Sequence, residues 1–247
     1  MRPQVSKPTA VRPARDAAAA HDGLAMPAGR SWARQAVLDA STAALRPLMS
    51  RRARRLAAQS PEPRVHLGCA YTILPGWINV DLFGRVPADV ALDVKKPLPF
   101  DDGSIDAIFT EHMVEHLTYE EAFALARECA RVLRPGGVVR VVVPDFERYV
   151  RSYLGENDLI ETNFPDRLTS LIGVASSAYG WAHRSIWDAE TLVALLERAR
   201  LCATGSRFGE SLIRPCPDKR ERQAESLYVE AVNESSADTD GVPSQTS

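Results

Sequence analysis

Residues 64–81 read RVHLGCAYTILPGWINVD, and this stretch decides the fold. Its first residues, 64–67, are mostly apolar and predict a short strand that runs into a turn at Gly68. A second short strand is predicted at 77–81, and it ends in the acid Asp81. A strand, a glycine turn and a second strand with an acid at its end indicate an α/β sheet that binds its ligand at the strand ends.

The chain on either side continues this alternation of strands and helices. Five further stretches have the length and the apolar content of strands, at 89–93, 105–110, 138–143, 203–208 and 226–232. Helices are predicted at 119–133, where Pro135-Gly136-Gly137 stops the pattern, and at 188–200. The expected fold class is α/β, a Rossmann-like three-layer sandwich with a mostly parallel sheet. Only 13 positions separate Gly68 from Asp81, which predicts a first helix that is shortened or lost.

The two ends of the chain differ in composition from its middle. Residues 1–30 carry four prolines among Ala and Arg, which predicts a disordered basic extension. A helical pattern follows within 31–60, with a bend expected at Pro47, and predicts an amphipathic helical extension that covers part of the sheet. The ligand-binding domain is expected over 61–232, and the polar residues 233–247 predict a disordered tail.

Composition excludes several classes of protein. Hydrophobic residues make up 45% and charged residues 25%, as in soluble domains, and no apolar run reaches the roughly 20 residues of a membrane helix. Residues 1–64 hold 12 Lys/Arg against 4 Asp/Glu, but their arginines lack interleaved aromatic residues, so we expect no nucleic-acid partner. The four cysteines show neither close pairing nor CxxC spacing, which favours a reducing, cytoplasmic location.

Six motifs occur in a fixed order between residues 64 and 146. They are LGCA at 67–70, GWINVDL at 76–82, LPFDDGSID at 98–106, EHMVEHL at 111–117, RVLRPGG at 131–137 and PDF at 144–146. Together they resemble the class I S-adenosylmethionine-dependent methyltransferases, in particular the small type 11 group. The stretch 183–199 resembles the final helix of that family. The resemblance implies a methyltransferase of EC class 2.1.1 with S-adenosyl-L-methionine as its cofactor.

The resemblance also implies a cofactor site at the ends of the first four strands. Its expected residues are Gly68, Cys69, Ala70, Asp81, Leu82, Asp93, Val94, Thr110, Glu111 and His112. The small residues of the turn at 68–70 let the backbone approach the cofactor closely. Asp81 would accept hydrogen bonds from the ribose hydroxyls and Asp93 from the adenine amine. Residues 110–112 would line the methionine end.

Ala70 departs from the family pattern, which has a second glycine at this position. If the position needs a positive φ, the Cβ of Ala70 costs on the order of 1 kcal/mol. This departure and the shortened helix support the alternative function, a non-catalytic methyltransferase-like binding or scaffold protein. An NAD-dependent oxidoreductase is disfavoured because the GxGxxG spacing is missing.

Histidines are the candidate bases for methyl transfer to a hydroxyl, because neutral imidazole is available near pH 7. We expect His112 first, since it follows the fourth strand, and His183 second, since it lies in the variable segment of the acceptor wall. His112 and His116 are four residues apart and would share a helix face. The HExxH order is absent, however, so no metal site is expected, and Glu115 and His116 are interpreted as satisfying backbone groups.

The expected acceptor is a small molecule or a glycan that presents a hydroxyl or an amine. Its wall is expected within 146–187, whose aromatic residues either stack on a ring or close the core: Tyr149, Tyr153, Tyr179, Trp181 and Trp187. We expect Arg131, Arg134 and Arg140 to be solvated or paired with acids. The composition indicates no integral membrane segment and leaves the oligomeric state open.

Overall fold

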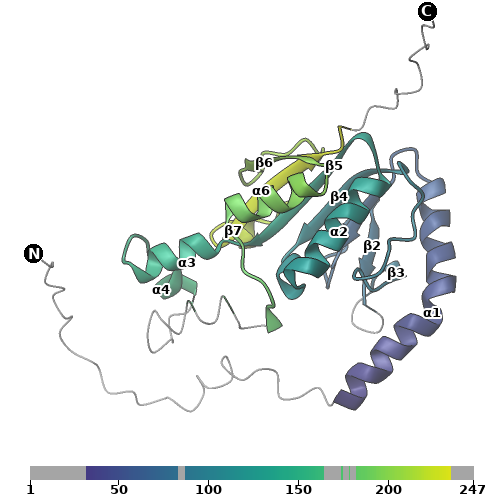
Figure 1. Ribbon diagram of the computed structural model, residues 1–247, viewed down its shortest axis with the longest axis horizontal. Coiled ribbons are helices and arrows are strands. Elements are labelled where there is room, and N and C mark those ends of the chain that lie inside the picture. The colour runs from purple at the N-terminus through teal and green to yellow at the C-terminus, as the bar shows by residue number, and fades with distance from the viewer. Residues whose placement is uncertain (1–31, 83–86, 164–173, 175–177, 179–181, 235–247) are drawn as a thin grey trace, which may run out of the picture.

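The structure is a computed structural model that describes residues 32–82, 87–163, 174, 178 and 182–234. Its described strands form one seven-stranded sheet in the order β3-β2-β1-β4-β5-β7-β6 (Figure 1). Their bounds are β1 Arg64–Leu67, β2 Ile78–Asp81, β3 Val90–Ala91, β4 Ile105–Glu111, β5 Leu133–Pro144, β6 Cys202–Ser206 and β7 Ser226–Val232. The pairs among β1 to β5 are parallel, whereas β7 is antiparallel to both of its neighbours. This sheet confirms the predicted Rossmann-like α/β class.

Three helices cover one face of the sheet. They are α1 (Trp32–Ala58), α2 (Tyr119–Val132) and α6 (Ala189–Arg198), and Figure 1 shows α2 and α6 in front of the strands with α1 beside β2 and β3. One apolar cluster joins all three to the sheet, with Ala53 from α1, Leu125 from α2 and Leu192 from α6 packed among strand residues. This burial is the main source of the stability of the helix layer.

The opposite face is covered mainly by loops in the described part of the chain. No helix lies between β1 and β2, where one is predicted to be shortened or lost, because residues 68–77 form only turns and extended chain. A separate cluster of Phe109, Val142 and Tyr228 is covered by Leu74 and Trp77 from that loop, and by Phe208. The third layer of the sandwich therefore consists mainly of the loops 68–77 and 207–225.

Helix α1 is continuous through Pro47, and Figure 1 shows that it changes direction along its length, as predicted. Its contact with the sheet rests on small residues, because Ala53 and Ala57 are buried while Leu48 is 58% exposed. Arg46 adds a hydrogen bond of 2.7 Å from Nη2 to the carbonyl of Pro97. The predictions of disorder for 1–30 and for 235–247 concern residues outside the described ranges.

The Pro135-Gly136-Gly137 motif ends α2 as predicted, but it lies within β5 instead of in a loop. The backbone of Asn233 holds it there. The backbone carbonyl of Asn233 accepts from Gly136 N at 2.7 Å, and its backbone N–H donates to Gly137 O at 2.9 Å. Strand β3 is shorter than predicted. Further helices in the described ranges are η2 (Val114–His116), α3 (Phe146–Tyr153), α4 (Leu159–Asn163) and η4 (Arg220–Arg222). Among the described residues, no helix is long and apolar enough to cross a membrane.

Candidate active site

The turn after β1 is held closely against the next strand. The N–H groups of Gly68 and Cys69 both donate to the carbonyl of Val80, at 2.9 and 3.1 Å. Gly68 has φ of 71°, and a Cβ at this position would lie 2.4 Å from Cγ of Met113. Both the backbone conformation and the contact with Met113 therefore require glycine.

Asp81 closes the turn from the end of β2. Its Oδ2 accepts from Ala70 N at 2.8 Å, and its Oδ1 accepts from Leu82 N at 2.6 Å. A carboxylate has about four acceptor sites, so each oxygen keeps capacity for another donor, such as a ribose hydroxyl. Ala70 itself has φ of 43°, so the strained conformation considered from the sequence is present.

Asp93 and Val94 follow the short strand β3. Asp93 Oδ1 accepts a hydrogen bond of 3.0 Å from Lys95 N, and the side chain is half-buried. Val94 packs against the main apolar cluster. The two residues lie one strand further along the same sheet edge than Asp81, where the resemblance expects the adenine.

Two buried polar atoms at the end of β4 have no hydrogen-bond partner among the described residues, Thr110 Oγ1 and Glu111 Oε1. Burial raises the pKa of Glu111, and its Oε2 lies 3.8 Å from Nζ of Lys219. Lys219 also donates to Thr72 Oγ1, which joins the two loops of the third layer. Unpartnered buried polar atoms call for a polar ligand, and S-adenosylmethionine presents amino, carboxyl and hydroxyl groups. The residues of this edge therefore fit the implied cofactor.

His112 is mostly buried directly after β4, with 14% of its side chain exposed. It has φ of 50°, its Nε2 lies 2.9 Å from Ser226 Oγ, and its Nδ1 lies 3.6 Å from Oε1 of Glu115. Burial, followed by the charge of Arg222, lowers the pKa of His112 to about 3, so the ring is neutral at pH 7. Burial raises the pKa of Glu115 to about 8. The site thus contains a neutral imidazole beside a carboxyl group that resists ionisation.

The segment 111–117 is not the start of a regular helix. Only Val114–His116 form a short 3-10 helix, and α2 begins after Thr118. Thr118 and Glu121 form a capping box that fixes this start. The prediction that His112 and His116 share one helix face is therefore wrong, because the chain turns between them.

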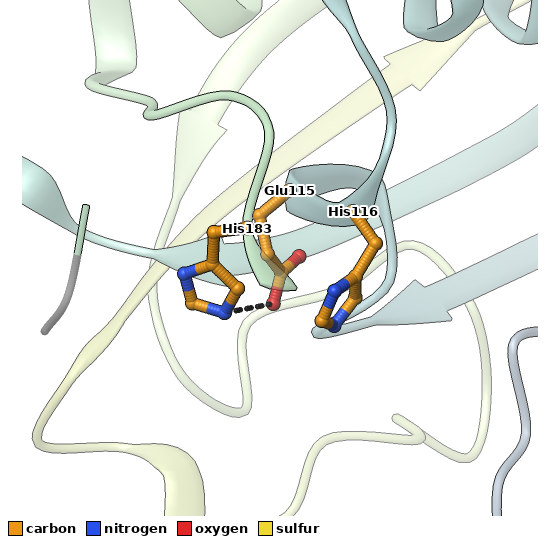
Figure 2. A group of neighbouring side chains, drawn as sticks. All are labelled: Glu115, His116 and His183. Carbon is orange, nitrogen blue, oxygen red and sulfur yellow. Dashed lines mark ion pairs between the residues drawn. The ribbon is translucent and has the colours of Figure 1, made fainter. Parts of the chain in front are cut away.

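His183 reaches the same place from a distant part of the sequence. The backbone N–H groups of Arg184 and Ser185 donate to the carbonyl of Glu115, at 2.8 and 3.2 Å. These bonds bring His183 Nε2 to 4.0 Å from Glu115 Oε1, and its ring to 5.1 Å from that of His116, measured between centroids. Figure 2 shows the Glu115 carboxylate between the two rings.

A narrow pocket opens at this point, next to the end of β5. It is shallow and open to solvent, with almost no enclosed volume, and its lining residues are Glu115, Pro144, Phe146, His183, Ser185, Ile186 and Trp187. The sequence predicted His183 in the acceptor wall but not Glu115 or Ser185. The only sequence signals were the second acid of the motif EHMVEHL and a serine two residues before a tryptophan, and neither shows which residues it contacts in the fold.

Among the described residues, most of the aromatic side chains predicted to line the acceptor site are buried in the core. Tyr149 is 2% exposed and Trp187 is 1% exposed, whereas Tyr153 is 50% exposed. Tyr179 and Trp181 lie outside the described ranges. The three arginines are paired with acids: Arg131 with Glu128 and Asp102, Arg134 with Asp106, and Arg140 with Asp218 and Glu230.

Residues 45–141 match the protein family described as Methyltransferase domain. A search of curated proteins finds no match. Among solved structures, the chain is similar to an S-adenosylmethionine-dependent methyltransferase from Archaeoglobus fulgidus, at 18% identity over 76% of this chain and 94% of that one, with a TM-score of 0.44. It is also similar to an S-adenosylmethionine-dependent methyltransferase from Thermotoga maritima, at 16% identity over 75% and 92% of the two chains, with a TM-score of 0.44.

The matched residues contain the glycine turn, Asp81 and the segment 111–117, which together form the strand-end site. The strand order, with β7 antiparallel beside β5, is that of the class I methyltransferase fold. The expected family, enzyme class and cofactor are confirmed. Residues 45–141 form a methyltransferase domain by this match, and the enzyme class that goes with the domain is S-adenosylmethionine-dependent methyl transfer, EC 2.1.1.

Proposed function

We propose that the enzyme methylates a hydroxyl group of a small molecule or glycan that enters the pocket beside His183. The observation that carries this proposal is the position of the pocket, which lies at the carboxyl end of β5 next to Glu115 and His183. Ligands of α/β sheets bind at this edge. The pocket is a shallow depression with almost no enclosed volume, so we infer that the acceptor lies against it from the solvent side.

The cofactor is proposed to lie along the same edge, from β3 to β4. The turn 68–70 lies against its middle, Asp81 and Leu82 bind the ribose, and Asp93 and Val94 bind the adenine. Thr110, Glu111 and His112 face the methionine end. Support comes from the spare acceptor sites of Asp81 and from the unpartnered atoms Thr110 Oγ1 and Glu111 Oε1.

When bound, S-adenosylmethionine would supply a methyl carbon made electrophilic by the positively charged sulfur to which it is bonded. The protein aligns the two reactants, which contributes most of the acceleration in a methyl transfer. His183 holds the acceptor hydroxyl and takes up its proton, since its side chain is 9% exposed and lines the pocket. His112 was the first candidate base from the sequence. Its low pKa makes it a weak base, so we assign it a supporting position on the other side of Glu115 from His183.

The test is formation of S-adenosylhomocysteine in the presence of a panel of sugars, phenols and amines. We expect turnover with at least one hydroxyl compound, and a loss of about 100-fold or more in kcat/KM for His183→Ala. Cys202→Ser is the matched control, because Cys202 is exposed on β6 and should leave turnover unchanged. Turnover confined to amines, or full activity of His183→Ala at all pH values, would show that this proposal is wrong.

A further inference from the structure

Three side chains of metal-binding type meet beside the pocket. Glu115, His116 and His183 each offer one ligand atom, and these atoms all lie within 4.8 Å of one another. Figure 2 shows the carboxylate between the two imidazole rings, with His183 Nε2 4.0 Å from Glu115 Oε1. The ligands of a tetrahedral zinc ion, at about 2.1 Å from it, stand roughly 3.4 Å apart. Small side-chain rotations therefore bring these atoms to coordinating distance.

The buried carboxyl group of Glu115 is a second, independent sign of a ligand. Its side chain is 2% exposed, and its Oε2 has no hydrogen-bond partner in the described part of the chain. Within the same ranges, the ion-pair partners within 4.0 Å of this carboxylate are His112 and His183, and no Lys or Arg is among them. The ionised form of this carboxyl group would be strongly unfavourable here without a nearby positive charge, and a bound cation would supply that charge.

The backbone holds the three side chains in fixed relation. Glu115 and His116 belong to one 3-10 helix, and the carbonyl of Glu115 accepts from the N–H groups of Arg184 and Ser185. Nδ1 of His116 lies 3.4 Å from the carbonyl of Ala182, on the residue before His183. Metal-binding histidines commonly donate their second nitrogen to a backbone carbonyl, which orients the ring for the ion.

We propose that Glu115, His116 and His183 bind one divalent transition-metal ion, with Zn²⁺ as the expected occupant and its fourth position open to the pocket. Two imidazoles and one glutamate form the protein ligand set of several catalytic zinc sites. Mg²⁺ and Ca²⁺ prefer oxygen ligands and suit this set less well.

This inference deepens the proposed function and rests on it for the place of the acceptor. An acceptor hydroxyl in the fourth position would lose its proton more readily, because bound Zn²⁺ lowers the pKa of a coordinated water to about 7. In the metal-loaded enzyme His183 is then a ligand and not the proton acceptor. The proton leaves to solvent through the open side of the pocket.

The experiment titrates Zn²⁺ alone into full-length protein that has been stripped with a chelator, without cofactor or acceptor. Calorimetry is expected to show one ion per chain, with a Kd of about 1 μM or tighter. His116→Ala and His183→Ala should each weaken binding at least about tenfold. Co²⁺ in place of Zn²⁺ should give visible absorption bands without a thiolate charge-transfer band.

Cys202→Ser is the matched control against adventitious binding to a thiol, and its affinity for Zn²⁺ should equal that of the unchanged chain. Glu115→Gln is a third ligand variant, of nearly unchanged shape, and circular dichroism checks that each variant is folded. No Zn²⁺ binding, or binding that survives in folded His116→Ala, His183→Ala and Glu115→Gln, would overturn the metal site.

Titration of the same samples with S-adenosylmethionine separates the two proposals. Cofactor binding and hydroxyl methylation in the full absence of Zn²⁺ binding would remove the metal site and leave the proposed function standing. Zn²⁺ binding that depends on the three ligands, without methylation of any hydroxyl compound, would support the metal site and remove the proposed acceptor.

Discussion

Ala70 shows how one residue adjusts the turn at 68–70, the proposed cofactor turn. Its φ of 43° is a conformation that favours glycine, and its N–H donates to Asp81. The hydrogen bond from Ala70 to the carboxylate helps to keep the turn in place despite the strain. The conformation of the turn is therefore stabilised by hydrogen bonds to β2 and Asp81, and not by the intrinsic backbone preference of Ala70.

Replacing Ala70 by Gly should raise the free energy of unfolding by about 1 kcal/mol, because glycine adopts a positive φ without steric strain. Thermal and urea unfolding measure this change. The matched control is Ala43→Gly on the exposed side of α1, which should lower stability by about 1 kcal/mol. Equal destabilisation by both changes would contradict the strain at Ala70.

Asp81→Ala should weaken S-adenosylmethionine binding by about 2 kcal/mol, or about 30-fold in Kd, because hydrogen bonds to a charged acceptor are lost. Calorimetric titration measures the affinity. Asp101→Ala is the control, since Asp101 is an exposed acid away from the turn. An unchanged Kd for Asp81→Ala would mean that the ribose binds elsewhere.

At the scale of elements, a buried charge joins three strands to a loop. Arg140 of β5 is fully buried, with two bonds of 2.6 Å to Asp218 and a distance of 3.2 Å to Glu230 of β7. It also donates to Ser206 of β6 and to the carbonyl of Arg207. The guanidinium thereby connects the antiparallel edge of the sheet to the loop 207–225.

Arg140→Met should destabilise the fold by about 3–5 kcal/mol, because Asp218 and Glu230 are then buried without a cation. Urea denaturation measures the loss, and the added change Asp218→Asn should recover part of it. Arg134→Met is the matched control, since Arg134 is 51% exposed in its pair with Asp106 and contributes about 1 kcal/mol or less. A similar loss for both arginines would contradict the role of burial.

The helices and strands followed from the sequence where their patterns are local. Strand β7 lies at 226–232 as predicted, and α2 starts at Tyr119 because Thr118 caps it. The strand conformation of Pro135–Gly137 was not predictable, because it depends on backbone hydrogen bonds to Asn233, almost 100 residues later in the chain. Strand β3 is short because only Val80 and Asp81 of β2 pair with it.

For the whole molecule, the site depends on contacts between distant segments. The motifs placed the glycine turn, Asp81 and the end of β4 at one edge of the sheet, which parallel strands bring together. The meeting of His183 with Glu115 depends on backbone hydrogen bonds across almost 70 residues, and no local pattern records such contacts. The sequence therefore predicted which strand ends lie at one edge of the sheet, but it did not predict that Glu115, His116 and His183 meet there.

The stability of the whole molecule should depend on pH through His66 in β1. Burial lowers the pKa of His66 to about 4, below its ordinary value of 6.5. The unfolded chain therefore binds a proton first, and the contribution of His66 is present above pH 6.5 and is lost as the pH falls toward 4. His66→Gln should reduce the loss of stability between about pH 7.5 and about pH 5 by about 2 kcal/mol.

Urea denaturation of both proteins at the two pH values measures this difference. His112, whose pKa burial also lowers, acts in the same direction and is present in both proteins, so its contribution cancels in the comparison. An equal loss of stability in the unchanged chain and in His66→Gln would contradict the assignment to His66.

The one-sided helix layer has a consequence for how ligands enter and leave. Loops open at a lower free energy than packed helices, so the loops 68–77 and 207–225 can fluctuate while α1, α2 and α6 stay closed on the sheet. The cofactor turn begins the first loop, and Lys219 of the second bonds to Thr72 of the first. We therefore expect ligands to exchange on the loop-covered face of the sheet, while the helix-covered face supplies most of the resistance to unfolding.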